Sequence, residues 1–484
     1  MITKGIATRS LWIVAAIFFA SIVLLGGSSR HDLMQVIAMR PVAILCVFFA
    51  LAFVSRGSLR EHLTFAILLF GFILWTFVQL VPLPPGLWHG LPGREAIIAL
   101  DKELLGQSPW RPISLSPTTG WSAFASLAVP AAALLFAVVL RLEVKVLLGL
   151  VALLGLLNLV FAFLQIASGG ADALQFYRVS NRGAATGLFA NENHMGVFLA
   201  LTLLVVAKLL ISAIKMRSRP IVVAGYGFAL PAVFLAILMN GSRAGVALGI
   251  LAALGVLLMF WFSAARKPTA PRSEANRQKK AKSSGFLGRL SLRSVGFSSL
   301  ALVFVGLFAA FVTLERIPGI ESGINQDPLS DLRWQLIAPL SDMAATHWLF
   351  GTGMGSFAFV YFQFEPVEMA RPVYVNQAHN DWFQFVIEGG LPAVLLFIAL
   401  AIYVAKRILK LVRLKGFTSE AVVFWLFVLS IIAAASAVDY PLRTGIFQVS
   451  LVWLFCALTL ETQPNVRTEG LRKFVPANGR GQAR

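Results

Sequence analysis

Runs of about twenty consecutive apolar residues recur along almost the whole chain. The hydrocarbon core of a bilayer is about 30 Å thick, so a helix needs roughly 20 such residues to cross it. The runs are centred near residues 18, 47, 72, 130, 156, 202, 230, 253, 305, 400, 430 and 453. We therefore predict an all-α polytopic membrane protein with about twelve transmembrane helices.

Composition supports this class. Hydrophobic residues make up 58% of the chain, charged residues make up 13%, and the mean hydropathy is +0.79, which excludes a soluble globular domain. The first run, residues 11–26, has a basic start but no small-residue cleavage site, so we expect a retained helix rather than a signal peptide. Cys46 and Cys456 both fall inside predicted helices, which leaves the outer loops without a disulfide pair or a thiolate metal site.

Lysine and arginine are concentrated in alternate loops. Cytoplasmic loops carry an excess of these residues. The segments expected on the same side of the membrane as the N-terminus hold 29 of the 41 basic residues but only 6 of the 22 acidic ones. We therefore expect both termini in the cytoplasm. The basic loop at 263–295 then anchors this topology on anionic lipid, and the net charge of +19 needs no nucleic acid to explain it.

This topology predicts four parts. Residues 1–312 form a bundle of nine helices, with an outer loop at 81–120 and the basic cytoplasmic loop at 263–295. A large, partly helical outer loop at 313–391, three final helices at 392–460 and a cytoplasmic tail at 461–484 follow.

The outer loop at 81–120 is rich in proline and tryptophan. Proline fixes the backbone and tryptophan favours the level of the lipid headgroups, so we interpret this loop as a cap at the membrane interface. Contact with a lipid-linked or sugar ligand is the alternative.

The sequence of the large outer loop predicts two helical pieces around a turn. Apolar residues repeat at helical spacing from Leu332 to Met343, with Ser330 or Asp331 as the cap, so Arg333 falls in the first turn of a surface helix. The sequence Gly-Thr-Gly-Met-Gly at 351–355 lacks the preceding strand and the lysine of a phosphate-binding loop, and it indicates a turn.

His379 and Asn380 precede the second helical piece. Asp381 followed by Gln384 predicts a capping box, and residues 389–392, Gly-Gly-Leu-Pro, end that helix and begin the next span. Both residues then lie at a helix N-terminus, where backbone N–H groups favour an anion. A histidine that is merely solvated is the plain alternative.

Arg243 lies between two apolar runs with almost no loop between them. It is therefore expected at the outer membrane interface, flush with the bundle. An arginine at this level either reaches lipid phosphate or binds the phosphates of a lipid ligand, and the sequence leaves both open.

Four segments together resemble the O-antigen ligase and polymerase family, membrane glycosyltransferases that use polyprenyl-diphosphate-linked glycans at the periplasmic face. The segments cover roughly residues 180 to 400. In chain order they are Gly-Leu-Phe-Ala-Asn-Glu-Asn-His at 187–194, Gly-Ser-Arg-Ala-Gly at 241–245, Arg333-Trp334 before the glycine turn, and Ala-His-Asn-Asp at 378–381.

The resemblance implies a glycosyl transfer that needs neither a metal nor a cofactor. Arg243 and Arg333 would hold the diphosphate of the donor, and His379 would be the general base for the acceptor hydroxyl. Five further residues in the same segments would support the site: Asn380, Asp381, Asn191, Asn193 and His194.

The same resemblance implies the setting and the partners. The chain would be a multi-pass protein of the bacterial inner membrane with a periplasmic active site in its large periplasmic loop. Its partners would be a lipid-linked glycan donor, a glycan or lipid A-core acceptor, membrane lipids and polysaccharide-assembly proteins, and not nucleic acid.

Two alternatives remain open at this level. Gly390 fits the stricter ligase pattern but Ala393 does not, so ligase and polymerase both stand. A transporter, such as a flippase for lipid-linked oligosaccharide, would also have about twelve spans, but it should carry ionisable residues near the bilayer midplane. The predicted spans hold almost none away from their ends.

Overall fold

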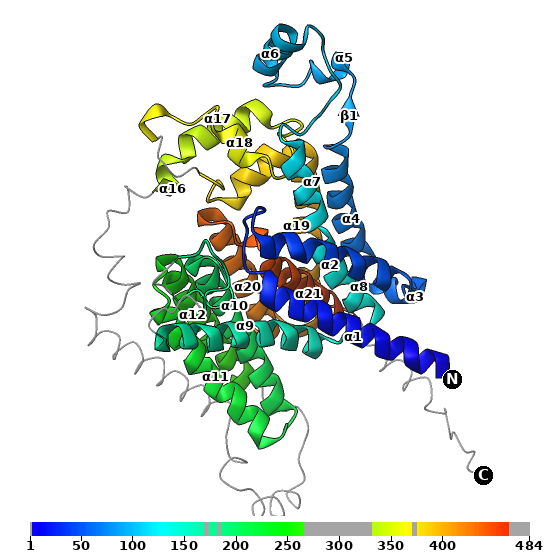
Figure 1. The fold of residues 1–484 in the computed structure, drawn as a ribbon. Helices are drawn as coiled ribbons and strands as arrows, with labels where there is room; N and C mark the ends of the chain where they lie inside the picture. The colour runs from blue at the N-terminus through cyan, green and yellow to red at the C-terminus, as the bar shows by residue number, and fades with distance from the viewer. Residues whose placement is uncertain (1, 169–173, 182–184, 266–331, 370–374, 464–484) are drawn as a thin grey trace, which may run out of the picture.

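The computed structural model describes residues 2–168, 174–181, 185–265, 332–369 and 375–463 (Figure 1). Its elements before the largest gap are α1 (Ile2–Leu25), α2 (Met34–Leu51), α3 (Arg56–Leu59), η1 (Arg60–His62), α4 (Leu63–Val78), β1 (Pro82–Leu83), α5 (Pro85–Trp88), α6 (Glu95–Leu105), β2 (Arg111–Pro112), α7 (Pro117–Ser126), α8 (Ala128–Val139), α9 (Val144–Ala167), α10 (Glu192–Lys215), α11 (Pro220–Met239) and α12 (Arg243–Ala265). After the gap come α16 (Leu332–Gln335), α17 (Ile337–His347), α18 (Phe357–Tyr361), η6 (Val367–Met369), α19 (Asp381–Lys415), α20 (Glu420–Val438), η7 (Pro441–Arg443) and α21 (Gly445–Glu461).

Nine helical segments among the described residues are long and apolar enough to cross a membrane. They are Met34–Leu51, Arg56–Val78, Pro117–Val139, Val144–Ala167, Glu192–Lys215, Pro220–Met239, Arg243–Ala264, Asp381–Lys415 and Glu420–Val438, and Arg9–Leu25 and Gly445–Glu461 are shorter apolar helices. The predicted all-α membrane class is confirmed. Every predicted run except the one near residue 305 coincides with one of these helices.

The predicted run near residue 305 lies outside the described residues. So do residues 266–295 of the basic loop, the start of the large outer loop with Ser330 and Asp331, and most of the C-terminal tail. The total of about twelve spans and the four-part division therefore stay predictions.

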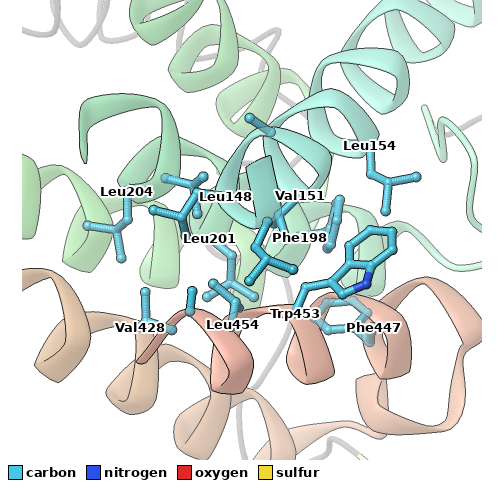
Figure 2. Close-up of a cluster of buried hydrophobic side chains, with 14 of the residues drawn as sticks. Leu148, Val151, Leu154, Phe198, Leu201, Leu204, Val428, Phe447, Trp453 and Leu454 are labelled. Atoms are coloured by element: carbon cyan, nitrogen blue, oxygen red, sulfur yellow. The ribbon is translucent and has the colours of Figure 1, made fainter. Parts of the chain in front are cut away.

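Helix α10 runs through the centre of the bundle. Nearly all of its side chains from His194 to Ala213 are buried, and it packs against α9, α11, α12 and α20. Figure 2 shows part of this core, in which Leu148 of α9, Phe198 of α10 and Val428 of α20 lie together. A helix that is apolar all round requires such a position, because it has no face suited to water.

Glycines allow α10 and α12 to approach closely. A Cβ atom added to Gly196 would lie 2.8 Å from the Cα atom of Gly245 and 2.7 Å from Oδ1 of Asn240. Small residues at a helix seam bring backbones together and gain van der Waals contact, which is the main source of helix association in lipid. This seam fixes the start of α12 against the first turns of α10.

The two predicted outer segments contact each other. The backbone N–H of Leu115 donates to Thr352 O at 2.8 Å, and Nε2 of Gln79 donates to the carbonyls of Phe350 and Glu388 at 3.1 and 2.9 Å. In Figure 1 the elements from β1 to β2 and those from α16 to α18 lie at the same end of the bundle.

The proline-rich segment has a core of its own. Its strands β1 and β2 pair antiparallel, and Trp88 is buried against Leu91 and Ile113 with its indole N–H donating to Pro112 O. Trp88 is 2% exposed because it fills this core, and the level of the segment relative to the lipid headgroups stays a prediction. Trp110 is exposed.

Residues 351–355 form the predicted turn. Gly351, Gly353 and Gly355 all have positive φ, and a Cβ atom on Gly351 would lie 2.3 Å from Glu388 O. Backbone N–H groups of Thr352 and Gly353 donate to the carbonyls of Ile387 and Glu388. Gly351 thus allows a close approach to α19, whereas Cβ atoms on Gly353 and Gly355 would meet Ser114 and Thr119.

Helix α19 contains both helices predicted around Gly390. Gly390 has φ 62° and ψ −167°, which breaks the helical geometry and kinks the element at the predicted boundary. The predicted capping residue is wrong by one position. The N-cap is Asn380, whose Oδ1 accepts from the N–H groups of Trp382 and Phe383, and the Gln384 side chain accepts from Ala378 N instead of closing a capping box.

The helix predicted from Leu332 to Met343 is divided at Leu336 into α16 and α17. Leu336, Leu340 and Met343 are buried together as predicted, because they lie on one face that packs on α18 and α19. Arg333 lies in α16, as expected.

Candidate active site

His379 has a backbone conformation that few residues adopt. Its φ is 49°, in the left-handed region that costs a non-glycine residue about 1 kcal/mol or more. Hydrogen bonds on both sides enforce it, because Gln384 holds Ala378 N and Asn380 caps α19. The side chain of His379 is 25% exposed.

Asp439 lies behind the His379 ring. It directly follows the last residue of α20 and is 1% exposed. Its Oδ1 lies 3.7 Å from His379 Nδ1 and 3.8 Å from His194 Nε2, and it accepts the N–H of Tyr440 at 3.0 Å. Two imidazoles from different parts of the sequence therefore share one buried carboxylate oxygen.

The neighbours of the Asp439 carboxyl favour its ionised form. Burial alone would raise the pKa of Asp439, but the attraction of His194, with smaller contributions from His379, outweighs burial and holds the pKa below its usual range. Asp439 therefore supplies a fixed negative charge on the protein side of the His379 ring.

Tyr440 lies between the two histidines. Its ring centroid is 4.9 Å from that of His379 and 5.0 Å from that of His194, and both contacts are edge to face. Burial and the charge of Asp439 raise the pKa of the Tyr440 phenol, and contact with Asn191 and the charges of Arg333 and Arg30 oppose this rise. The phenol stays protonated, and Arg333 is within electrostatic range of the site.

Asp381 fixes the loop that carries Asp439. Its Oδ2 accepts from Ser436 Oγ at 3.1 Å and from Leu442 N at 3.4 Å, and its backbone N–H donates to Asp439 O at 3.3 Å. Asn380 adds a bond from Nδ2 to Ala437 O at 2.8 Å. These predicted supporting residues thus hold the 437–443 segment against the start of α19.

Arg443 completes this contact. Its Nη2 lies 3.0 Å from Oε2 of Glu388, which is fully buried, and its Nε lies 3.7 Å from Oδ1 of Asp381. Glu388 also accepts from Phe357 N at 3.0 Å. The Arg443 guanidinium therefore joins the segment between α20 and α21 to α19. Through Glu388 it also joins this segment to α18.

The segment at 187–194 is held by polar side chains of α9. Oε1 of Gln165 accepts from the N–H groups of Thr186 and Gly187, and Oδ1 of Asn158 accepts from Leu188 N. Asn191 caps α10 by accepting from Asn193 N, which places His194 in the first turn of α10. His194 is 1% exposed and lies inside the bundle rather than at its surface.

Arg243 is the first residue of α12 and is half-buried. The hydroxyl of the preceding Ser242 donates to Oδ1 of Asn193 at 2.6 Å and accepts from Gly245 N at 2.9 Å. The start of α12 therefore contacts Asn193, and the next residue, His194, contacts Asp439, which in turn contacts His379. The predicted site segments are brought to one end of the bundle.

Sequence reasoning missed Asp439, Tyr440 and Arg443. A signal was available, because these polar residues occupy a short connection between two apolar runs, the same feature that drew attention to Arg243. Among the residues that the structure describes, no group of three or more histidine, cysteine, aspartate or glutamate side chains is arranged to hold a metal ion.

One comparison with known proteins gives a match. Residues 227–398 match the family model described as O-antigen ligase. The matched segment contains Arg243, Arg333 and His379, whereas His194 and Asp439 lie outside it. No curated protein matches the chain.

Proposed function

The match over residues 227–398 supports membership of the O-antigen ligase/polymerase family, and on this premise we propose that the chain is a membrane glycosyltransferase acting at the periplasmic face. It transfers or polymerises glycan from an undecaprenyl-diphosphate-linked donor during lipopolysaccharide O-antigen or exopolysaccharide biosynthesis. The acceptor is a growing glycan or lipid A-core.

The pairing of His379 with Asp439 is the observation that carries this proposal. Nδ1 of His379 faces the carboxylate at 3.7 Å, so Nε2 is the nitrogen offered to an acceptor hydroxyl. A buried carboxylate behind an imidazole orients the ring and stabilises the imidazolium that forms when the ring takes a proton. Asp439 is a positioning residue in this scheme.

The proposed reaction is a single displacement. His379 Nε2 takes the proton of the acceptor hydroxyl as its oxygen attacks the anomeric carbon of the donor sugar. The bond between that carbon and the diphosphate oxygen breaks, and the diphosphate leaves with the electron pair. Histidine suits the base role because it changes charge near neutral pH.

Arg243 and Arg333 are the proposed diphosphate ligands. Negative charge builds on the leaving group as its bond to the sugar breaks, and guanidinium groups stabilise phosphate oxygens through paired hydrogen bonds. Arg243 lies at a helix N-terminus beside the Asn193 contact, and Arg333 is within electrostatic range of Tyr440. Asn191, Asn193 and His194 support the site through these contacts.

The deciding experiment is the glycan made by a deletion strain complemented with the wild type or with His379→Ala. If the proposal holds, His379→Ala restores the protein in the membrane but not the glycan. Full-length polymer retained on its lipid carrier identifies a ligase, and single repeat units identify a polymerase. Lipid-linked precursor trapped on the cytoplasmic side would overturn the proposal in favour of a flippase.

A further inference from the structure

Two histidines approach a single carboxylate oxygen in the candidate active site. Oδ1 of Asp439 lies 3.7 Å from Nδ1 of His379 and 3.8 Å from Nε2 of His194. His379 is partly exposed, whereas His194 and Asp439 are almost wholly enclosed, with 1% and 2% of their side chains exposed. His194 is therefore placed to affect His379 through Asp439 and Tyr440 rather than by contact with the substrate.

The buried carboxylate of Asp439 accepts few hydrogen bonds. Its Oδ1 accepts one backbone N–H, from Tyr440, and its Oδ2 is buried without a hydrogen-bond partner among the described residues. A buried ionised carboxylate is costly unless a positive charge or several donors accompany it. The charge that accompanies Asp439 must therefore come from a neighbouring cation.

Among the described residues, the arginines near Asp439 interact with other groups. Arg443 is already shared by two carboxylates, Asp381 and Glu388. Asp381, on the α19 side, donates its backbone N–H to the carbonyl of Asp439 and brings no positive charge.

On the remaining sides, Arg30 forms an ion pair with Asp32, and Arg333 acts on the Tyr440 phenol. Glu192, two residues before His194 on α10, accepts from Asn181 and brings no positive charge. Among the described residues, the two imidazoles are thus the basic groups that directly contact the Asp439 carboxylate.

We propose that His194 is a positioning residue that carries the compensating proton for Asp439, so that His379 stays neutral and able to act as a base. The inference rests on the proposed function, because it assigns His379 the base role. A base must be unprotonated before it accepts the proton of the acceptor hydroxyl. A buried carboxylate favours a proton on an imidazole beside it, and His194 offers a second ring on which that proton can reside.

The test replaces His194 with glutamine, which keeps a side-chain N–H but cannot carry the charge. Transfer is measured against pH in membranes from the deletion strain. His194→Gln is expected to move the acidic half-activity point upward by about 1 to 3 pH units, because removing a cation near Asp439 increases its pull on a proton at His379. Activity should return at alkaline pH.

Asp439→Asn should move the acidic half-activity point to lower pH, because it removes the attraction between the carboxylate and a proton on His379. In the double variant, His194→Gln should cause no upward shift. An unshifted or downward-shifted point in His194→Gln would overturn the inference, since a merely structural histidine predicts lower activity at every pH and no displacement.

Chemical modification gives a second readout that does not depend on transfer. Diethyl pyrocarbonate acylates neutral imidazole, and mass spectrometry of the peptide with His379 reports its modification against pH. The midpoint for His379 should rise in His194→Gln. The matched control is His62→Gln, which removes another buried histidine, at the start of α4, and should leave the midpoint unchanged.

These measurements separate the two proposals. If His379→Ala retains transfer, the base assignment falls whatever His194 does. If His379→Ala is inactive and the His379 midpoint is the same in the wild type and His194→Gln, only the inference about His194 falls.

Discussion

His379 and Asp439 face each other at 3.7 Å although one precedes α19 and the other follows α20. Two helices that cross the bundle in opposite directions thus return the chain to the same end. The pair joins a partly exposed imidazole, on a residue with a strained backbone, to a buried carboxylate, and this arrangement is compatible with the proposed general base.

Replacing His379 with alanine should abolish glycan transfer. A general base contributes about 100-fold to 10,000-fold to the rate, so activity should fall by at least that range. Transfer would be assayed in membranes with the protein quantified by immunoblot. His89→Ala, an exposed histidine of the outer segment, is the control and should retain activity. Wild-type rates in His379→Ala would remove the base role.

Replacing Arg243 or Arg333 with alanine should weaken use of the donor. A hydrogen bond to a charged group contributes about 1.5 to 3 kcal/mol, so the donor KM or kcat/KM should change by roughly 10-fold to 100-fold for each variant. The measurement is initial rate against donor concentration. The exposed Arg219→Ala should match the wild type. Unchanged donor dependence in either variant would exclude that arginine from the diphosphate site.

Replacing Arg443 with methionine should destabilise the protein. Glu388 and Asp381 would then be left as uncompensated buried carboxylates, and breaking a buried ion pair costs about 3 to 5 kcal/mol. Thermal unfolding in detergent would measure the loss. Adding Glu388→Gln should restore part of it, because one unpaired charge is removed. A midpoint equal to that of the wild type would contradict the structural role of Arg443.

Replacing Gly196 with alanine should loosen the seam between α10 and α12. The added Cβ would lie 2.8 Å from the Cα of Gly245, and overpacking of this kind costs about 1 to 3 kcal/mol. Gly149→Ala in α9 is the matched control, since nothing lies within 4 Å of its added Cβ. The thermal midpoint should fall only in Gly196→Ala, and equal midpoints would refute the close contact.

Acid should destabilise the outer part through His347. Burial, assisted by the charge of Arg94, lowers the pKa of His347 to about 4 from 6.5. Between these values the unfolded state binds more protons than the folded state, so the contribution of His347 is full above pH 6.5 and is lost as pH falls through 4. The loss amounts to about 3 kcal/mol at most.

The thermal midpoint in detergent should therefore fall between pH 7 and pH 4.5 more steeply in the wild type than in His347→Leu. Parallel pH dependence of the two proteins would show that His347 does not titrate in this way.

Several features of the fold could be predicted from local sequence. The apolar runs indicated the helices, and the glycines at 351–355 and at Gly390 indicated a turn and a break, because these depend on the chemistry of neighbouring residues. The exact cap of α19 was missed, because Asn380 and Asp381 are both good capping residues, and the extended backbone of Asn380 in the folded protein makes it the N-cap.

The amino-acid sequence by itself determined the class of this protein, its helical segments and the short list containing His379, Arg243 and Arg333. These follow from the hydrophobicity that burial in lipid requires and from residue type, and both are local properties of the sequence. Only the tertiary structure decided that Asp439 and His194 stand behind His379. That choice depends on which helix ends meet after α10, α19 and α20 have packed, and long-range packing of apolar surfaces leaves no periodic signal in the sequence.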